Sequence, residues 1–458
     1  MIEVVRAFDR TPLAEVVTDG PAALENKLQT ASRLFADRSA RLKPFQRIEI
    51  LRRLASLVDG MHSHFALQIA CEGGKPLSDA MVEVDRAIDG IRNAVEVLRS
   101  LGGREVPMGL TPASADRRAF TIIEPIGVVA AISAFNHPLN LIVHQVVPAI
   151  AIGCPVIVKP APATPLCCLD FVQLVHEAGL PPDWCQTFLP ETNELAEALA
   201  TDNRIRFLSF IGSARVGWHL RSKLAPGARC ALEHGGAAPA IIAQSADLER
   251  IIEPLVKGAY YHAGQVCVST QRIYVHADLE TQFVERFAAR VTALKVGDPE
   301  SADTEVGPLI APRECDRVCS WIDEAVAGGA RSIGGGKASE TTLRPAILLN
   351  PAANAKVSTL EVFGPVTCIY PFTELESAIA AANALPMAFQ ASIFTKDLRT
   401  ALDTAERLEA GTVMINDHTA FRTDWMPFAG RRESGSGVGG IPWTMKDMTE
   451  EKMIVFRS

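Results

Sequence analysis

The sequence predicts an α/β protein with two units of alternating strands and helices. Its 458 residues are too many for one simple core, so two or three structural units are expected. Short apolar strands and helical stretches alternate between residues 128 and 224, and a second alternating series occupies residues 240–415. Strands that are apolar on both faces are typical of parallel sheets covered by helices. With right-handed crossovers, the first series forms a doubly wound, nucleotide-binding type of sheet.

The N-terminal part of the chain is predicted to be helical and then extended. Between residues 21 and 101, apolar residues recur at helical spacing, as in Leu51, Leu54 and Val58. Residues 103–123 instead combine Pro and Gly turn residues with alternating apolar positions, which predicts an extended hairpin.

The two alternating series place the remaining strands. The first has strands at residues 128–132, 155–158, 187–189 and 206–210, with helices at 138–152, 164–178, 194–200 and 215–224. The second has strands near residues 240–243, 272–275, 345–349, 366–370, 391–394 and 412–415. A last strand, at residues 453–456, lies beyond both series. Because a lone strand must pair, we expect it to join the 103–123 hairpin or another subunit.

Composition excludes several classes of protein. A net charge of −8 without a Lys/Arg run argues against a general nucleic-acid binder. The most apolar stretch, residues 138–159, is interrupted by Asn, His, Gln and Pro, so a buried helix and strand are expected rather than a membrane span. The N-terminus lacks a secretory pattern, and we expect a cytoplasmic protein. Ten cysteines form no paired Cys-x-x-Cys motifs and have no His cluster beside them, so neither a metal site nor a disulfide framework is expected.

Cys267 is the candidate nucleophile. It lies between a helix-like segment at residues 247–263 and a strand at residues 273–275, on the kind of connection that often holds catalytic groups. A thiol reacts as its thiolate, which a nearby base or dipole can supply. The alternative is a small buried apolar residue, the most frequent role of a cysteine.

Glu233 and Asn136 are candidate partners of this thiol. Glu233 ends a strand that runs into a Gly-Gly turn, where burial raises the pKa of a carboxyl group and suits a general base. Asn136 follows the strand at residues 128–132, where its amide N–H can stabilise a developing oxyanion. Taken singly, either residue can be an ordinary strand-end or turn residue.

Two further features indicate a nucleotide site. Lys159 ends the second strand of the first series, and Gly212 and Ser213 open a helix whose first amides can receive a phosphate. No Gly-x-Gly-x-x-Gly follows any strand, so the ordinary dinucleotide fingerprint is missing.

Seven spaced motifs together resemble the aldehyde dehydrogenase superfamily, and the resemblance covers about residues 10–458. They are Phe135-Asn136, Val158-Lys159-Pro160, Gly212-Ser213, Leu232-Glu233-x-Gly235-Gly236, Gly264-Gln265-x-Cys267, Glu361-Val362-Phe363-Gly364-Pro365 and Pro427-Phe428-x-Gly430-x-x-x-Ser434-Gly435. The resemblance implies NAD(P)-dependent oxidation of an aldehyde to an acid. In that scheme, the thiolate of Cys267 attacks the carbonyl, and its own N–H and the Asn136 amide stabilise the oxyanion. Hydride leaves to the nicotinamide, and Glu233 activates the water that hydrolyses the thioester.

The resemblance also implies the cofactor contacts. It places Lys159 on the adenosine ribose, Glu361 on the nicotinamide ribose with the Phe363 ring alongside, and Ser213 on the pyrophosphate, with Gly212 and Gly235 in the same set. Pro162 stands where members selective for NAD carry Glu, so a 2′-phosphate is not repelled and NADP is expected to be tolerated. A preference for NADP over NAD is a hypothesis.

The stretch at residues 416–425 bears on the substrate. Its Phe-Arg-x-Asp pattern is most similar to the lactaldehyde and phosphonoacetaldehyde dehydrogenase branch. Arg422, His418 or His137 are candidates to bind a small aldehyde that is anionic or hydroxylated. An internal interaction of Arg422, with Asp424 or with the backbone, is the open alternative.

The resemblance implies an aldehyde dehydrogenase-like fold of three parts. These are a dinucleotide-binding domain (residues 1–102 and 124–232), a catalytic domain (residues 233–430) and a small β oligomerisation arm (residues 103–123 and 440–458) that makes a homodimer or homotetramer. Two other functions stay open: a CoA-acylating semialdehyde dehydrogenase, which commonly lacks the base, and a non-catalytic protein that keeps the fold.

Overall fold

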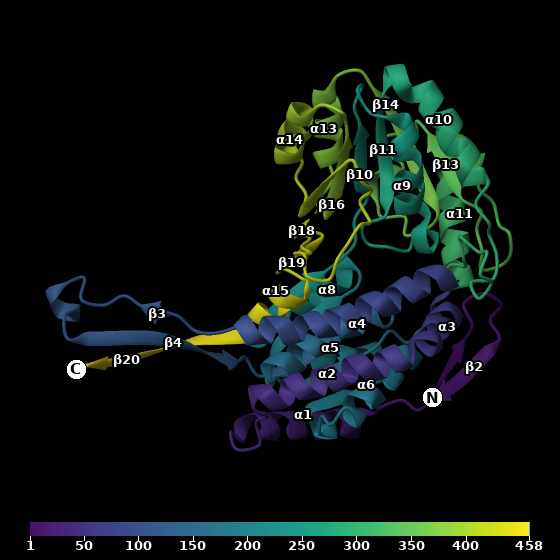
Figure 1. Cartoon of the computed structure of the whole chain (residues 1–458). Helices are drawn as coiled ribbons and strands as arrows, with labels where there is room; N and C mark the ends of the chain where they lie inside the picture. Colours follow the sequence, from purple (N-terminus) through teal and green to yellow (C-terminus); the bar gives the residue numbers. More distant parts are fainter. Residues whose placement is uncertain (458) are drawn as a thin grey trace.

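Two large sheets covered by helices form the body of the protein, and a slender three-stranded sheet extends away from it (Figure 1). The computed structural model describes residues 1–457. Both series of alternating strands and helices are present, which confirms the predicted fold class.

The first large sheet has six strands, and its core strands are parallel. In spatial order they are β19 (Gly435–Ser436), β9 (Arg229–Glu233), β8 (Ile205–Ile211), β5 (Val128–Ile132), β6 (Val156–Lys159) and β7 (Cys185–Thr187). Only the short edge strand β19 is antiparallel to its neighbour. All five residues of the central strand β5 are buried, as expected for a sheet covered on both faces.

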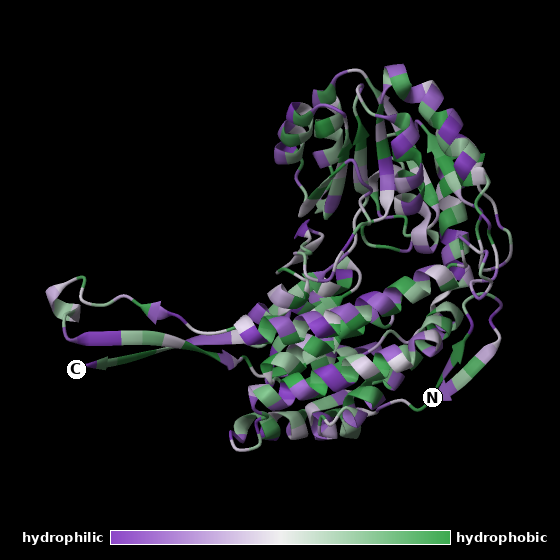
Figure 2. Ribbon diagram, in the orientation of Figure 1, coloured by the Kyte–Doolittle hydropathy of each residue, from purple (hydrophilic) through white to green (hydrophobic). Residues whose placement is uncertain are grey.

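Helices cover both faces of this sheet, with their apolar sides turned inward (Figure 2). One face carries α2 (Pro44–Gly60), α3 (His62–Gly73), α4 (Leu77–Ser100), α5 (Asn140–Ile152) and α6 (Leu166–Glu177). The other carries α1 (Pro21–Ala36), α7 (Asn193–Thr201) and α8 (Ala214–Ser222). This is the doubly wound arrangement, in which the carboxyl ends of the parallel strands share one edge.

The second large sheet has seven strands. In spatial order they are β12 (Arg331–Gly334), β13 (Ala346–Leu349), β14 (Val366–Phe372), β11 (Thr270–His276), β10 (Ala238–Ile242), β16 (Gln390–Phe394) and β17 (Thr412–Ile415). Helices α9 (Leu248–Tyr260), α10 (Ala277–Thr292) and α11 (Pro312–Ala327) cover one face, and α13 (Leu375–Asn383) and α14 (Leu398–Arg407) lie on the other side (Figure 1). The edge strand β12, which is antiparallel, was not predicted.

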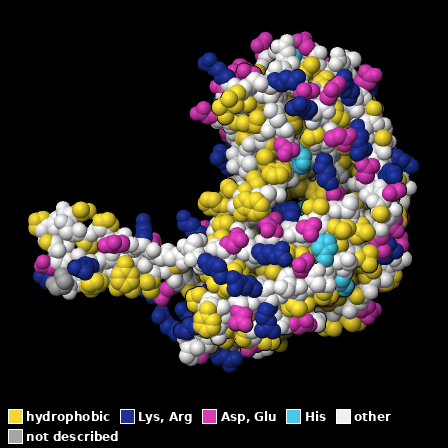
Figure 3. All heavy atoms as spheres, viewed as in Figure 1, with side chains coloured by type: hydrophobic (Ala, Val, Ile, Leu, Met, Phe, Trp, Pro, Cys, Tyr) yellow, Lys and Arg dark blue, Asp and Glu magenta, His cyan; other side chains and the backbone are white. Residues whose placement is uncertain are grey.

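The three-stranded sheet forms the projecting arm. Strand β20 (Thr449–Arg457) pairs along its whole length with β4 (Arg117–Pro125), which also pairs with β3 (Glu105–Val106). The prediction that the terminal strand joins the hairpin is therefore confirmed. Hydrophobic side chains lie exposed along this arm (Figure 3), among them Phe120 and the run at residues 453–456.

Two segments differ from the prediction. Helix α15 (Ile441–Asp447) lies in the segment assigned to the arm, but Ile441 and Met445 are buried in the core formed with α4 and α5. The N-terminal hairpin of β1 (Ile2–Val5) and β2 (Pro12–Val16) was not predicted, because each strand is too short to show a clear alternation. Within residues 1–457, no helix combines the length and apolar character needed to cross a bilayer.

Candidate active site

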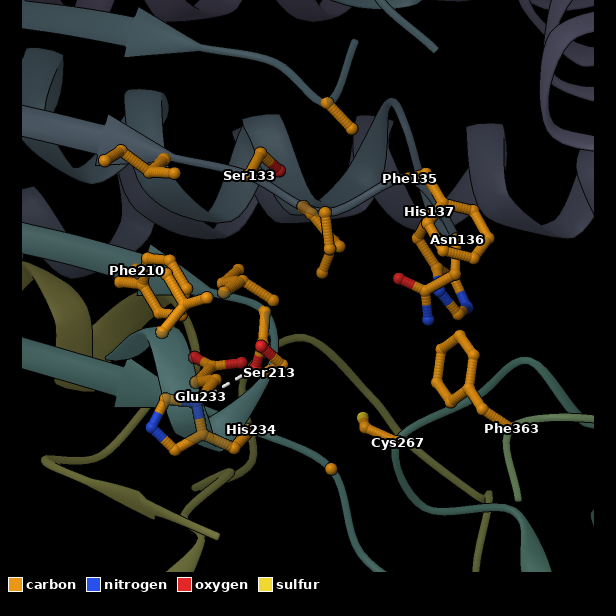
Figure 4. A pocket seen from close by; sticks show the side chains of 18 of the residues that line it. Ser133, Phe135, Asn136, His137, Phe210, Ser213, Glu233, His234, Cys267 and Phe363 are labelled. Carbon is orange, nitrogen blue, oxygen red and sulfur yellow. Dashed lines mark hydrogen bonds between the residues drawn. The ribbon is translucent and has the colours of Figure 1, made fainter. Parts of the chain in front are cut away.

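A cavity of about 650 Å³ lies at the carboxyl edge of the six-stranded sheet. Its lining includes residues that follow β5, end β6, follow β8 and end β9, and residues that precede β11. Figure 4 shows Asn136 and Cys267 on facing walls of this space, with Ser213 and Glu233 farther along it. The cavity therefore brings together predicted residues that are up to 286 positions apart in the sequence. Those that form part of its lining are Asn136, His137, Lys159, Gly212, Ser213, Glu233, Gly235, Cys267, Glu361, Phe363 and Arg422.

The turn before Cys267 has an unusual backbone. Residues His262 and Ala263 of the short 3-10 turn Tyr261–Gly264 have φ angles of 49° and 54°, in the left-handed region that L-residues other than Asn and Asp seldom occupy. The helix-like segment therefore ends at Tyr260 rather than at Ala263, and the chain turns sharply before it enters β11. Strained backbone of this kind persists where the surrounding structure fixes it, often at functional sites.

Cys267 presents its thiol to the cavity (Figure 4). Burial raises the pKa of this thiol to about 12, while the positive charge of Arg422 acts in the opposite direction. In the free protein at neutral pH, the side chain is therefore mainly a thiol, and only a small fraction is thiolate.

This pKa predicts how alkylation of Cys267 depends on pH. We expect the rate of modification by iodoacetamide to rise about tenfold per pH unit from about pH 7 to about pH 9, because only the thiolate reacts and its fraction grows at that rate below the pKa. Peptide mass spectrometry measures the rate at Cys267 directly. A rate that levels off near neutral pH would contradict the raised pKa.

Asn136 is held by the backbone next to the nucleophile. Its Nδ2 donates to the carbonyl oxygen of Gln265 at 2.9 Å, and the side chain is almost fully buried. A carboxamide nitrogen carries two N–H bonds, so one remains for an oxygen atom in the cavity. This arrangement suits an oxyanion that forms on a carbonyl attacked by Cys267.

Glu233 ends β9 and lies against Gly439. A Cβ built at position 439 would overlap the Glu233 carboxylate, so glycine is needed there for the present position of this side chain. Burial raises the pKa of Glu233, and Arg422 opposes that change. Within residues 1–457, no hydrogen bond holds the carboxylate, which leaves it free to accept a proton from water.

Lys159 and Glu361 provide polar groups for a dinucleotide. Burial lowers the pKa of Lys159 to about 8, and within the described part of the chain no carboxylate pairs with its ammonium. Burial raises the pKa of Glu361 to about 8, while one of its oxygens accepts from the Gly236 N–H at 3.2 Å. A Cβ at Gly235 would overlap the Glu361 carboxylate, which explains the glycine at that position. These donors and acceptors fit the hydroxyl groups of two riboses.

The other residues predicted for the cofactor line the same cavity. Ser213 is the N-cap of α8, whose first amides face the cavity beside Gly212, and a helix start of this kind suits a phosphate. The Phe363 ring makes an edge contact with Phe135 at 5.9 Å between centroids. Together these groups fit a dinucleotide, although the chain lacks the usual glycine fingerprint.

Arg422 lies in the cavity and forms no ion pair with a carboxylate of residues 1–457. Its guanidinium stacks on Phe428, 3.6 Å from the ring centroid, and one nitrogen donates to His144 Nδ1 at 3.4 Å. Its Nε is buried and has no hydrogen-bond partner in the described chain. The internal pair with Asp424 that the sequence left open is not formed, since Asp424 pairs with Arg86 at 2.9 Å instead.

The predicted histidines separate in space. His137 lines the cavity, and burial lowers the pKa of its imidazole well below the usual range, so it is neutral. His418 is not part of the lining. Its Nδ1 accepts from the Ala420 N–H at 3.1 Å, and its side chain packs against Gly258 of α9. The structure therefore does not bring His418 together with the other candidates.

Sequence reasoning missed Arg86 and Tyr261, both of which line the cavity. Arg86 lies in the middle of α4, where a charged residue normally faces water, and only the tertiary fold turns it toward Asp424. Tyr261 stood beside the Gly-Gln-x-Cys motif, and its position six residues before Cys267 was a usable signal. Within residues 1–457, no cluster of three or more His, Cys, Asp or Glu side chains could hold a metal ion.

Comparison with known proteins agrees with this geometry. Residues 1–454 match the Aldehyde dehydrogenase family. A 3-sulfolactaldehyde dehydrogenase from Priestia aryabhattai is 36% identical over 454 residues, which cover 99% of this chain and 94% of the relative. A lactaldehyde dehydrogenase from Methanocaldococcus jannaschii is 34% identical over 414 residues, which cover 90% and 88%.

A solved structure has the same fold over the whole chain. The glyceraldehyde-3-phosphate dehydrogenase GapN from Methanocaldococcus jannaschii, complexed with NADP, has a TM-score of 0.95 and 30% sequence identity, and the match covers 100% of this chain and 99% of that one. The resemblance found in the seven motifs is confirmed. The chain therefore belongs to the aldehyde dehydrogenase family.

Proposed function

We propose that this chain is a hydrolytic, NAD(P)-dependent aldehyde dehydrogenase that acts on a small aldehyde carrying an anionic or hydroxyl group. One observation carries the proposal: the thiol of Cys267, the amide of Asn136 and the carboxylate of Glu233 line one cavity. Oxidation through a covalent intermediate needs a nucleophile, an oxyanion donor and a separate base, and the cavity offers one of each.

In the first half of the reaction, the thiol of Cys267 gives up its proton to water, and the resulting thiolate adds to the aldehyde carbon to form a thiohemiacetal. The carbonyl oxygen becomes an oxyanion, which accepts hydrogen bonds from the free Asn136 N–H and the Cys267 backbone N–H. A nicotinamide held beside Glu361 and Phe363 would supply the acceptor for the hydride of this carbon. Cys267 keeps the oxidised carbon on its sulfur as a thioester.

In the second half, Glu233 removes a proton from a water molecule, and the resulting hydroxide attacks the thioester carbon. The C–S bond breaks, the acid leaves, and the sulfur departs as the thiolate. The raised pKa of Glu233 makes it a stronger base than an exposed carboxylate, which helps it to activate water.

The same proposal assigns the cofactor residues. Lys159 and Glu361 hold the two riboses, Phe363 and Gly235 shape the space beside them, and Gly212 and Ser213 receive the pyrophosphate. Pro162 carries no charge that would repel a 2′-phosphate, so both NAD and NADP are accepted. The NADP complex of the related GapN structure supports this reading.

The anion site consists of Arg422 and Arg86. Asp424 forms an ion pair with Arg86, whereas Arg422 forms none within residues 1–457 and interacts with Glu233 only at longer range, so its guanidinium is available to an anionic ligand. Guanidinium groups bind carboxylates, sulfonates and phosphonates through paired N–H donors. A relative from Priestia aryabhattai is named a 3-sulfolactaldehyde dehydrogenase, and the sulfonate of such a substrate would suit this anion site.

Replacing Arg422 tests this site. We expect Arg422→Ala to raise KM about 10- to 100-fold for succinic semialdehyde or sulfolactaldehyde, because a charge-assisted hydrogen bond contributes about 1.5–3 kcal/mol. For propanal we expect less than about a threefold change. Any influence of Arg422 on the Cys267 thiol affects both aldehydes equally, so it cancels in the ratio of the change in KM for the anionic aldehyde to the change for propanal. Equal effects on anionic and neutral aldehydes would refute the assignment. Arg422→Lys keeps the positive charge but lacks the paired N–H donors of a guanidinium, so it shows which of the two properties the site needs.

Transfer of the acyl group to CoA is the alternative to hydrolysis of the thioester, and Glu233, a base that can activate water, argues against it. We expect the product acid to form at the same rate with and without CoA. Detection of an acyl-CoA product would contradict the hydrolytic step.

The proposal extends to the organisation of the chain. The six-stranded sheet with its helices is the dinucleotide-binding domain, the seven-stranded sheet is the catalytic domain, and the arm joins subunits into a homodimer or homotetramer. The exposed apolar residues of β20 support an interface there. All ten cysteines are free thiols, which fits a reducing, cytoplasmic location.

A further inference from the structure

The cavity contains a hydroxyl group and an imidazole that the reaction does not use. Tyr261 and His137 both line it, and Tyr261 Oη lies 3.5 Å from His137 Nε2. This is at the long end for a hydrogen bond, so neither group is saturated by the other. His137 directly follows Asn136, which places the pair beside the carbonyl end of a bound aldehyde.

The Tyr261 ring is held firmly in place. The ammonium groups of Lys257 and Lys75 lie 4.8 Å and 5.7 Å from its ring centroid. Lys257 pairs with Asp79, and Lys75 forms a fully buried pair with Glu83. A ring fixed in this way can present its hydroxyl to a ligand without losing rotamer freedom on binding.

A third residue of the lining has an unfilled hydrogen-bonding capacity. Asn140 lines the cavity, and its Nδ2 donates to Asp424 at 3.0 Å. Its Oδ1 is buried and has no partner in the described chain. A buried acceptor without a partner is costly, and a ligand hydroxyl that donates to it would remove that cost.

We propose that Tyr261, His137 and Asn140 recognise a hydroxyl group on the carbon next to the aldehyde, so that the substrate is a 2-hydroxyaldehyde. The inference rests on the proposed function. The substrate hydroxyl accepts a hydrogen bond from the Tyr261–His137 pair and donates to Asn140 Oδ1. A site built to bond a hydroxyl discriminates strongly against an analogue that lacks it, because its own polar groups are then left without partners.

The test compares lactaldehyde with propanal, which differ by this hydroxyl alone. In the wild type we expect a higher kcat/KM for lactaldehyde. Tyr261→Phe keeps the ring between the two lysines and is expected to lower kcat/KM for lactaldehyde about tenfold, with less than a twofold change for propanal. Tyr260→Phe is the matched control, since Tyr260 Oη donates to the Ala346 carbonyl in the core, and it should leave the ratio unchanged.

Product binding gives a readout that is independent of turnover. We expect lactate to raise the Tm of the wild type more than propionate does, and Tyr261→Phe to abolish the difference. A lactaldehyde-to-propanal ratio that is the same in the wild type and Tyr261→Phe, or equal effects of lactate and propionate on the wild type, would overturn the inference. If neither aldehyde produced NAD(P)H, the proposed function would be wrong. The difference in Tm between lactate and propionate would still show whether these residues recognise the hydroxyl group.

Discussion

Cys267→Ala is expected to lose aldehyde oxidation by at least about 10⁴-fold, because Cys267 supplies the one thiol among the lining residues within positions 1–457. Binding of NADP should change little, since the residues assigned to the cofactor remain. The steady-state rate of NADPH formation measures the first effect, and fluorescence titration with NADPH measures the second.

The matched control for this variant is Cys319→Ala. Cys319 is a partly buried cysteine on α11, outside the lining of the cavity, and its removal should leave the rate within about twofold of the wild type. Retention of more than about one per cent of the activity in Cys267→Ala would show that the sulfur is not the nucleophile.

Glu233→Gln is expected to stop the reaction after the first half. The amide cannot remove a proton from water, so the steady-state rate should fall about 10²- to 10⁴-fold, while a burst of NADPH close to one per active site remains. Stopped-flow absorbance resolves the burst from the slow phase.

The pH dependence of kcat provides a check on the same residue. Glu233 is active as the deprotonated carboxylate, so where hydrolysis limits turnover, kcat of the wild type should rise as pH passes through the pKa of Glu233, which burial places above its usual range. In Glu233→Gln this rise should be absent. Loss of the burst together with the steady state would mean that Glu233 acts before hydride transfer.

Much of the fold could be predicted from local patterns. The strands β5 and β6, which are apolar except for the terminal Lys159, and the helices that follow them indicated a parallel sheet. The terminal strand had to pair because its edges could not remain open. The buried helix α15 was missed because its seven residues give too short a period to separate a packed helix from the arm.

The candidate site also contains residues that the sequence indicated and residues that it did not. Glu233 and Asn136 stand at the carboxyl ends of strands of one sheet, so their positions in the chain already indicate a shared edge. Cys267 lies on the connection before β11 of the other sheet, and the resemblance to the family indicated its place beside them. Arg86 could not be found like this, because its place in the cavity depends on how the helix α4 packs, whereas the closeness of Tyr261 to Cys267 in the sequence was a signal that could have been used. His418 is the opposite case. It belongs to the same stretch at residues 416–425 as Arg422, which predicted a place at the substrate, but its side chain packs against α9.

The central claim is that Cys267 is acylated by the substrate, and one measurement tests it most directly. Glu233→Gln is mixed with an aldehyde and NADP, quenched in acid, digested and examined by mass spectrometry. We predict an acyl adduct, with the mass of the substrate acid less water, on the peptide that contains Cys267, and none when NADP is omitted. An unmodified Cys267, or an adduct on another cysteine, would contradict the claim.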